Sequence, residues 1–164
     1  MVPAMPVVPL PELAALRAGH HRLLGLDVGT RTVGLALSDT RLVIATPFET
    51  IRRARFAADA ARIVEVVQKQ GVGGFVIGLP VGMDGVEGPR CQSVRAFARN
   101  LLAVIDLPAA FWDERLSTAA VERAMIEADM TRKRRAETID RAAAAYILQG
   151  ALDALAREAG PPRS

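Results

Sequence analysis

The chain has 164 residues, of which 51% are hydrophobic and 24% are charged. This length suits one domain with a single core, and the composition excludes a disordered chain. A membrane helix needs about 20 consecutive apolar residues, and no run in the sequence approaches that length. The N-terminal stretch 1–11 is rich in proline and lacks the pattern of a signal peptide. We therefore expect a soluble, cytoplasmic protein with no membrane partner.

The net charge of +3 comes almost entirely from arginine, since Lys69 and Lys133 are the only lysines. The planar guanidinium group suits phosphate oxygens, although an arginine-rich chain can also reflect a GC-rich genome. Two dense basic clusters are candidates for contact with nucleic acid, and the alternative for the first of them is a solvated loop between helices. The first cluster consists of Arg132, Lys133, Arg134 and Arg135, and the second of Arg52, Arg53 and Arg55.

Cys91 is the only cysteine. An internal disulfide and a cysteine metal cluster are both excluded by this count. We expect Cys91 to be a small, buried, apolar side chain.

The first half of the sequence predicts a short N-terminal helix followed by three strands. The run Arg22–Val28 is almost continuously apolar, as in a strand buried on both faces, and the alternation of Val33, Leu35 and Leu37 predicts a second strand. Tight turns between the strands predict an antiparallel meander. The predicted segments are the helix 10–17, the strands 22–28, 33–37 and 42–45, and a third-strand end at Pro47.

The second half predicts helices alternating with strands. Pro89 is well placed to open a helix, and Ser117 and Thr138 can cap two more. Helical crossovers return the chain parallel, so we expect an α/β fold in which a five-stranded mixed sheet carries helices on both faces. The predicted helices span 56–70, 89–104, 117–128 and 138–158, and the strands span 74–79 and 109–112. We expect a proline-rich arm over 1–20, one domain over 21–158 and a flexible tail over 159–164.

Three acidic residues stand at positions that a purely structural chain would rarely give them. Asp27 ends the first strand, Glu114 follows the fifth, and Asp140 falls in the first turn of the predicted last helix. Ligands bind beyond the carboxyl ends of strands in open parallel sheets. In this topology the ends of the first and fifth strands can be neighbours, and the last helix can pack across them.

Each acid also has a simple structural reading. Asp27 could cap a turn, Glu114 could pair with Arg115, and Asp140 could favour the dipole of its helix. Three carboxylates at one sheet edge repel one another unless a cation neutralises them. An all-oxygen ligand set suits Mg²⁺ or Mn²⁺, and two such ions about 4 Å apart can activate a water and stabilise the leaving oxygen of a phosphodiester. The sequence therefore predicts a metal-dependent nuclease with Asp27, Glu114 and Asp140 as catalytic metal ligands.

Four segments of the chain closely resemble the YqgF family, whose members are called pre-16S rRNA nucleases or RuvX-type Holliday junction resolvases. The resemblance covers roughly residues 22–155, with the segments in the family's order and spacing. The segments are LLGLDVGTRTVGLALSD (23–39), VIGLPVGMDGVEGP (76–89), WDERLST (112–118) and TRKRRAETIDRAAAAYILQ (131–149).

The resemblance implies a ribonuclease H-like fold and a metal-dependent nuclease that matures the 5′ end of 16S rRNA. Its partner would be precursor 16S rRNA or a pre-ribosomal particle, bound by a monomer or a homodimer. Asp27 matches the aspartate of the family's first strand, Glu114 the glutamate of its Asp-Glu-Arg motif, and Asp140 the aspartate of its last helix.

The loop 80–88 departs from the family pattern, which usually reads Gly-Leu-Pro-Leu-Asn-Met-Asp-Gly. Here Val81 and Gly82 replace Leu and Asn. Gly82 removes an amide that could hydrogen-bond RNA or orient Asp84, and it adds backbone freedom. We expect Asp84 to be a turn residue before Gly85 and not a metal ligand.

Two other functions compete with the RNA nuclease. A Holliday junction resolvase must engage two duplexes and would act as a symmetric dimer. An inactive RNA-binding module would keep the basic residues and would not need the three acids. An actin-like ATPase, whose first phosphate loop also carries an Asp-x-Gly-Thr turn, is excluded by size.

Overall fold

The computed structural model describes residues 7–116 and 132–158, with side chains in the last helix from residue 139 onward. None of the helices in these ranges is both long enough and apolar enough to cross a membrane. The elements run in the order η1 (Leu10–Arg17), β1 (Arg22–Val28), β2 (Thr32–Ser38), β3 (Ala45–Arg52), α1 (Phe56–Gln70), β4 (Val72–Leu79), α2 (Pro89–Val104), β5 (Ala109–Asp113), η2 (Glu114–Leu116) and α4 (Arg132–Glu158).

The five strands form one mixed sheet in the order β3-β2-β1-β4-β5. Strands β1, β2 and β3 pair antiparallel, as predicted for the meander. Strands β4 and β5 join parallel to β1, since α1 and α2 each return the chain to the same end of the sheet. The predicted α/β architecture is confirmed.

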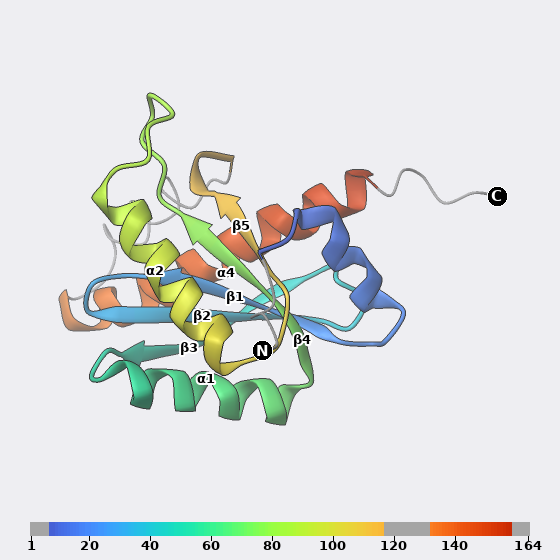
Figure 1. The fold of residues 1–164 in the computed structure, drawn as a ribbon, viewed down its shortest axis with the longest axis horizontal. Helices are drawn as coiled ribbons and strands as arrows, with labels where there is room; N and C mark the ends of the chain where they lie inside the picture. The colour runs from blue at the N-terminus through green and yellow to red at the C-terminus, as the bar shows by residue number, and fades with distance from the viewer. Residues whose placement is uncertain (1–6, 117–131, 159–164) are drawn as a thin grey trace.

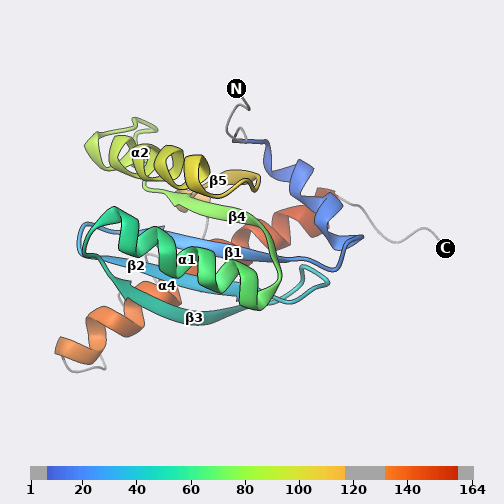
Figure 2. The ribbon, with the colours of Figure 1, turned by 60° about the horizontal axis from the view of Figure 1, so that its bottom comes forward.

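Helices cover both faces of the sheet (Figures 1 and 2). Helices α1 and α2 pack on one face, where Leu24, Leu26 and Phe75 belong to the larger core cluster. Helix α4 and η1 pack on the other face, where Leu13 and Ile147 belong to the second cluster. Because side chains alternate along a strand, successive residues of β1 feed the two cores in turn.

Helices α1 and α2 have the predicted bounds, Phe56–Gln70 and Pro89–Val104. Gly71 ends α1 in the left-handed conformation, where glycine carries no Cβ penalty. Cys91 is fully buried in the α2 core, as predicted, and this burial raises the pKa of its thiol. The N-terminal helix η1 also has its predicted bounds, although its hydrogen bonding is of the 3-10 type.

The predicted third strand was placed too early in the chain. Strand β3 runs through Pro47, and the preceding segment is a loop closed by Asp39, whose carboxylate accepts the N–H groups of Val43 and Ile44. Proline is tolerated because β3 is an edge strand, and the β2–β3 register shifts beside it, between Leu35 and Ala36.

The last helix begins earlier than predicted. Helix α4 begins at Arg132, so Thr138 is not its cap and Asp140 is its ninth residue, in the third turn. The basic cluster 132–135 therefore opens this helix and is not a loop. The helix predicted over 117–128 lies outside the described residues.

The edge strand β3 is joined to α1 by an ion pair. The guanidinium of Arg62 donates to both carboxylate oxygens of Glu49, with an Nε–Oε2 distance of 2.7 Å. This hydrogen bonding lowers the pKa of Glu49. The side chain of Arg62 also reaches Glu65 of its own helix.

Candidate nuclease centre

Asp27 lies near the carboxyl end of the central strand β1 and is only 8% exposed. It shares a face of the strand with Gly25, where an added Cβ would meet Leu148 and the backbone of Ala144, both in α4. Asp27 therefore faces α4. Its neighbour on β2 is Gly34. On β4 the register Leu26–Ile77 places Gly78 beside it.

Gly34 allows the backbone of α4 to lie directly on the sheet. A Cβ atom at position 34 would stand 2.0 Å from the carbonyl oxygen of Asp140, a distance that only a missing side chain permits. The hydroxyl of Thr32, two residues earlier on β2, donates a hydrogen bond to Oδ2 of Asp140. These two contacts bring Asp140 to the strand next to Asp27.

Gly78 allows the carboxylate of Glu114 to lie over β4. A Cβ atom at position 78 would stand 2.8 Å from Oε1 of Glu114 and 2.5 Å from Cδ1 of Ile147. The expectation that the ends of the first and fifth strands are neighbours is wrong, because β4 lies between β1 and β5. Glu114 follows β5 as the first residue of η2, and its side chain reaches back across β4 over the glycine.

Gly34, Asp27 and Gly78 are neighbours across β2, β1 and β4 and form one row of the sheet. Asp140 lies over the first of these residues, and the carboxylate of Glu114 lies over the last. Neighbouring strands lie about 4.8 Å apart, so this row spans about 10 Å. Among the side chains that the structure describes, no three His, Cys, Asp or Glu groups gather closely enough to hold a metal ion. The donor set itself, three carboxylates with no nitrogen or sulfur, fits Mg²⁺ or Mn²⁺.

Arg115 forms an ion pair with Asp113, the residue before Glu114. Its Nη2 lies 2.6 Å from Oδ2 of Asp113, and this hydrogen bond lowers the pKa of the carboxyl. The carboxylate of Asp113 also accepts the backbone N–H of Arg115 at 2.9 Å. The pair fixes the segment that carries Glu114.

The loop 80–88 rises from the carboxyl end of β4 (Figure 1). Asp84 is a turn residue there, as predicted: its Oδ1 accepts the N–H of Val86 at 3.0 Å. A Cβ atom at position 82 would stand 2.8 Å from the same oxygen, so the glycine that departs from the family pattern gives this turn its room.

The first turns of α4 project beyond the sheet, at the end where β1 turns into β2 (Figures 1 and 2). The backbone of Arg132, Lys133, Arg134 and Arg135 forms this projecting part. A helix rises about 1.5 Å per residue, so Arg135 stands about 8 Å from Asp140 along the axis. Their side chains lie outside the described residues.

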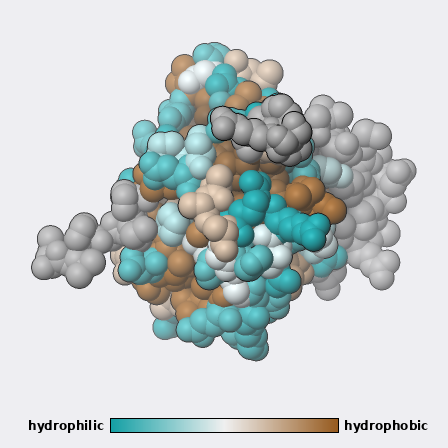
Figure 3. Space-filling view, turned by 90° about the vertical axis from the view of Figure 1, so that its right-hand side faces the viewer, coloured by the Kyte–Doolittle hydropathy of each residue, from teal (hydrophilic) through white to brown (hydrophobic). Residues whose placement is uncertain are grey.

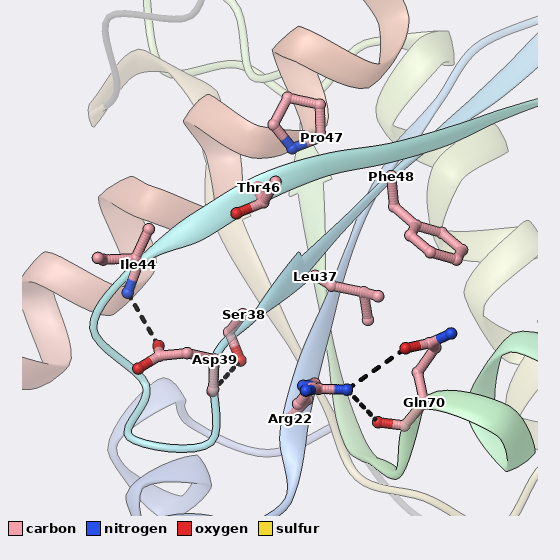
Figure 4. Close-up of a pocket in the computed structure, with 9 residues that line it drawn as sticks. All are labelled: Arg22, Leu37, Ser38, Asp39, Ile44, Thr46, Pro47, Phe48 and Gln70. Carbon is pink, nitrogen blue, oxygen red and sulfur yellow. Dashed lines mark hydrogen bonds between the residues drawn. The ribbon is translucent and has the colours of Figure 1, made fainter.

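A pocket of about 410 Å³ opens at the opposite end of the sheet, where β1 begins. In Figure 3, which faces this end, hydrophobic and hydrophilic residues are interspersed. Figure 4 shows that its polar groups serve the fold: Arg22 donates to Gln70, and Asp39 accepts from Ile44. Partial burial raises the pKa of Asp39, but the hydrogen bonds from backbone N–H groups lower it by more. The pKa of this carboxyl is therefore below its usual value. This pocket lies away from the three carboxylates.

Comparison with known proteins gives the same assignment as the fold and the row of carboxylates. The family profile described as "RuvX: Holliday junction resolvase" matches residues 21–154. This chain belongs to the RuvX family. The match covers the whole sheet and nearly all of α4, and with them Asp27, Glu114 and Asp140.

Relatives of this RuvX-family chain cover almost its full length. A protein of Paramagnetospirillum magneticum is 62% identical over 91% of this chain and 96% of its own. One of Rhodospirillum rubrum is 59% identical over 94% and 96%. Both carry the name "Putative pre-16S rRNA nuclease". The resemblance stated from the sequence is confirmed.

The fold is also that of solved RuvC structures. The Thermus thermophilus RuvC in complex with a Holliday junction substrate superposes with a TM-score of 0.55 over 85% of this chain and 96% of that one. The yeast mitochondrial resolvase Ydc2 has a TM-score of 0.50. Their sequence identities of 13% and 10% show the fold alone, which is the predicted ribonuclease H-like fold.

The three acids were predicted from the sequence, but the residues that position Glu114 and Asp140 were not. Gly34 and Thr32 place Asp140 against β2, and Gly78 leaves room for the carboxylate of Glu114 over β4. A glycine inside a strand often marks close approach of another backbone, so the glycines of β2 and β4 carried a usable signal.

Proposed function

We propose that this protein is a metal-dependent nuclease in which Asp27, Glu114 and Asp140 hold Mg²⁺ or Mn²⁺. The observation that carries the proposal is the row Gly34, Asp27, Gly78, because its two glycines admit carboxylate-bearing segments from two other elements. Membership of the RuvX family and the nuclease names of the relatives support the reaction class.

Each of the three acids is positioned by a different structural feature. Asp27 is fixed by strands paired on both its sides, Asp140 by the hydroxyl of Thr32, and Glu114 by the short η2 turn that follows β5. Bound divalent metal would activate a water and stabilise the oxygen that leaves the phosphodiester. The three residues supply negative charge on the same side of the sheet, and the side chains would draw closer together around a bound metal ion.

The proposed substrate is precursor 16S rRNA, free or in a pre-ribosomal particle in the cytoplasm, cleaved in maturation of its 5′ end. The names of relatives more than 50% identical favour this substrate. A four-way DNA junction is the alternative, favoured by the description of the family profile. A resolvase would act as a symmetric dimer, whereas the RNA nuclease can act as a monomer or a homodimer.

The test compares cleavage of precursor 16S rRNA and of a four-way DNA junction, each with Mg²⁺, with Mn²⁺ and in excess chelator. We expect cleavage of the RNA with metal only, and its loss in Asp27→Asn with the fold intact. Asp153→Asn is the matched control, because Asp153 is an exposed carboxylate on the same helix as Asp140. Full activity in excess chelator would exclude the metal mechanism, and cleavage of the junction alone would exclude the RNA substrate.

The other two ligands are tested by a mutant cycle. If Glu114 and Asp140 serve one centre, then Glu114→Gln, Asp140→Asn and the double variant lose similar, non-additive amounts of kcat/KM. A single variant with activity close to that of the wild type would remove its residue from the centre.

A further inference from the structure

A polar pocket of about 390 Å³ opens beyond the carboxyl end of β1. It is lined by the turn residues 28–30, by Arg53 and Ala54 between β3 and α1, and by Arg90, Ser93 and Val94 of α2. Two arginines that are 37 residues apart in the sequence therefore line one cavity. No acidic residue is among the lining groups, so the charge of the two arginines is not compensated there.

Arg53 is held in place before any ligand arrives. Its Nη1 donates to the carbonyl oxygen of Gly29 at 2.7 Å, and its guanidinium lies 5.3 Å from the centre of the Phe97 ring. Its backbone N–H donates to the carbonyl of Arg31 at 2.8 Å. An arginine whose fork is already ordered loses less entropy when it binds an anion. The carboxylate of Asp59 supports the same loop by accepting the N–H of Ala54.

Arg90 and Ser93 face the pocket from the first turns of α2. Within the part of the chain that the structure describes, neither side chain has a hydrogen bond or an ion pair. Helix α2 begins after Gly88 without a side-chain cap, so the positive end of its dipole adds to the charge of the arginines. The chemistry of the pocket suits an oxyanion that can accept bonds from a guanidinium fork and a hydroxyl.

The pocket stands next to the proposed nuclease centre, on the other side of the end of β1. Gly29 follows Asp27 by two residues, or about 7 Å along an extended strand. A nucleic-acid strand carries a phosphate about every 3.4 Å of helix axis. A strand that crosses the end of β1 would thus set one phosphate at the carboxylates and another, one or two nucleotides away, near the pocket.

We infer that this pocket binds a backbone phosphate of the nucleic acid, close to the phosphodiester that is cut. The inference rests on the proposed nuclease function and adds a second fixed point for the substrate. Arg53 and Arg90 would grip the phosphate from two sides, and Ser93 would donate to a third oxygen. The carboxylates and the pocket together would then set the position of the cut along the strand.

The test measures affinity for the cleaved nucleic acid in excess chelator, so that binding is separated from cutting. Arg90→Gln removes an exposed side chain with no partner among the described residues and should leave folding intact. We expect about tenfold weaker binding and a salt slope of log K that is lower by about 0.7 on a single strand, or about 0.9 on a duplex. Arg90→Lys should keep the slope while binding less tightly than the wild type, because it keeps the charge and loses the fork.

Arg99→Gln is the matched control. Arg99 is an exposed arginine of the same helix, nine residues on, and therefore about 180° around the axis and about 13 Å along it. Equal effects of Arg90→Gln and Arg99→Gln on affinity and slope would overturn the inference. So would loss of inorganic phosphate binding in Arg90→Gln with unchanged nucleic-acid affinity, since the pocket would then serve a free anion.

Failure of this inference and failure of the proposed nuclease centre give different results. If Asp27→Asn still cleaves while Arg90→Gln binds weakly and Arg99→Gln does not, the phosphate pocket stands and the catalytic assignment fails. If Asp27→Asn is inactive while Arg90→Gln binds as the wild type does, the catalytic assignment stands and the pocket is not a phosphate site.

Discussion

At the scale of single residues, two glycines are as important for the proposed centre as its three carboxylates. Gly34 and Gly78 flank Asp27 on either side in the sheet. The backbone of Asp140 occupies the space over the first, and the carboxylate of Glu114 occupies the space over the second. A side chain at position 34 would push the backbone of α4 away from the sheet, and one at position 78 would displace the side chains of Glu114 and Ile147.

Gly34→Ala should therefore destabilise the fold and reduce cleavage together. The added methyl would stand 2.0 Å from a backbone oxygen of α4, which cannot rotate away as a side chain can. Overpacking of this kind costs about 1–3 kcal/mol of unfolding free energy. Urea denaturation measures the loss. Gly88→Ala, where nothing lies within 4 Å of the added atom, should be nearly neutral, and equal losses in the two variants would contradict the close packing at Gly34.

At the scale of elements, helix α4 both covers the sheet and carries charge beyond it. Its middle packs on β1, β2 and β3 through residues such as Ala144 and Leu148, and its first turns project past the sheet with the basic cluster 132–135. Because the cluster is helical and not a loop, its position relative to Asp140 is fixed by helix geometry.

Neutralising Arg134 and Arg135 together should weaken nucleic-acid binding and flatten its salt dependence by about one to two units of slope, if both contact phosphate. Metal affinity should change little, because neither side chain can be a ligand. A salt titration of affinity measures both effects. The double variant Arg99→Gln/Arg157→Gln removes the same charge elsewhere and should keep the slope. Parallel slopes and unchanged affinity in the Arg134/Arg135 variant would mean that this cluster does not contact the substrate.

At the scale of the whole molecule, metal binding should couple to folding. The proposed ligands come from β1, η2 and α4, which are far apart in the sequence, so the unfolded chain does not offer the site. A ligand that binds only the folded state stabilises it by about 2.7 kcal/mol at 100 times its Kd.

Mg²⁺ or Mn²⁺ should therefore raise the Tm of the wild type and not that of Asp27→Asn. Without metal, the variant should be at least as stable as the wild type, because it removes one of three neighbouring negative charges. The emission of Trp112, the only tryptophan, follows unfolding, since its buried indole packs on Gly150 of α4. An equal rise of Tm in the wild type and in Asp27→Asn would show that the metal binds elsewhere.

The sequence by itself determined the order and type of most elements, and it predicted the three acids. The apolar run 22–28 and the helical spacing of 56–70 and 89–104 are local patterns, and local patterns can be read without the fold. The beginning of α4 and the extent of β3 could not be read in this way. Pro47 ends a strand by local rules, yet it is tolerated at the edge of a sheet, and edge position is a tertiary property.

Only the tertiary structure decided how the acids come together. The order of strands places β4 between β1 and β5, so the Glu114 carboxylate extends toward β1 over Gly78, and the backbone of Asp140 in α4 lies over Gly34 on the other side of Asp27. The pocket at Arg53 and Arg90 is likewise made by three segments that lie more than 20 residues apart in the sequence. These contacts depend on strand order, on register and on the absence of particular side chains. Strand order and register are established only when distant segments pack together, so they cannot be read from the spacing of residues along the chain.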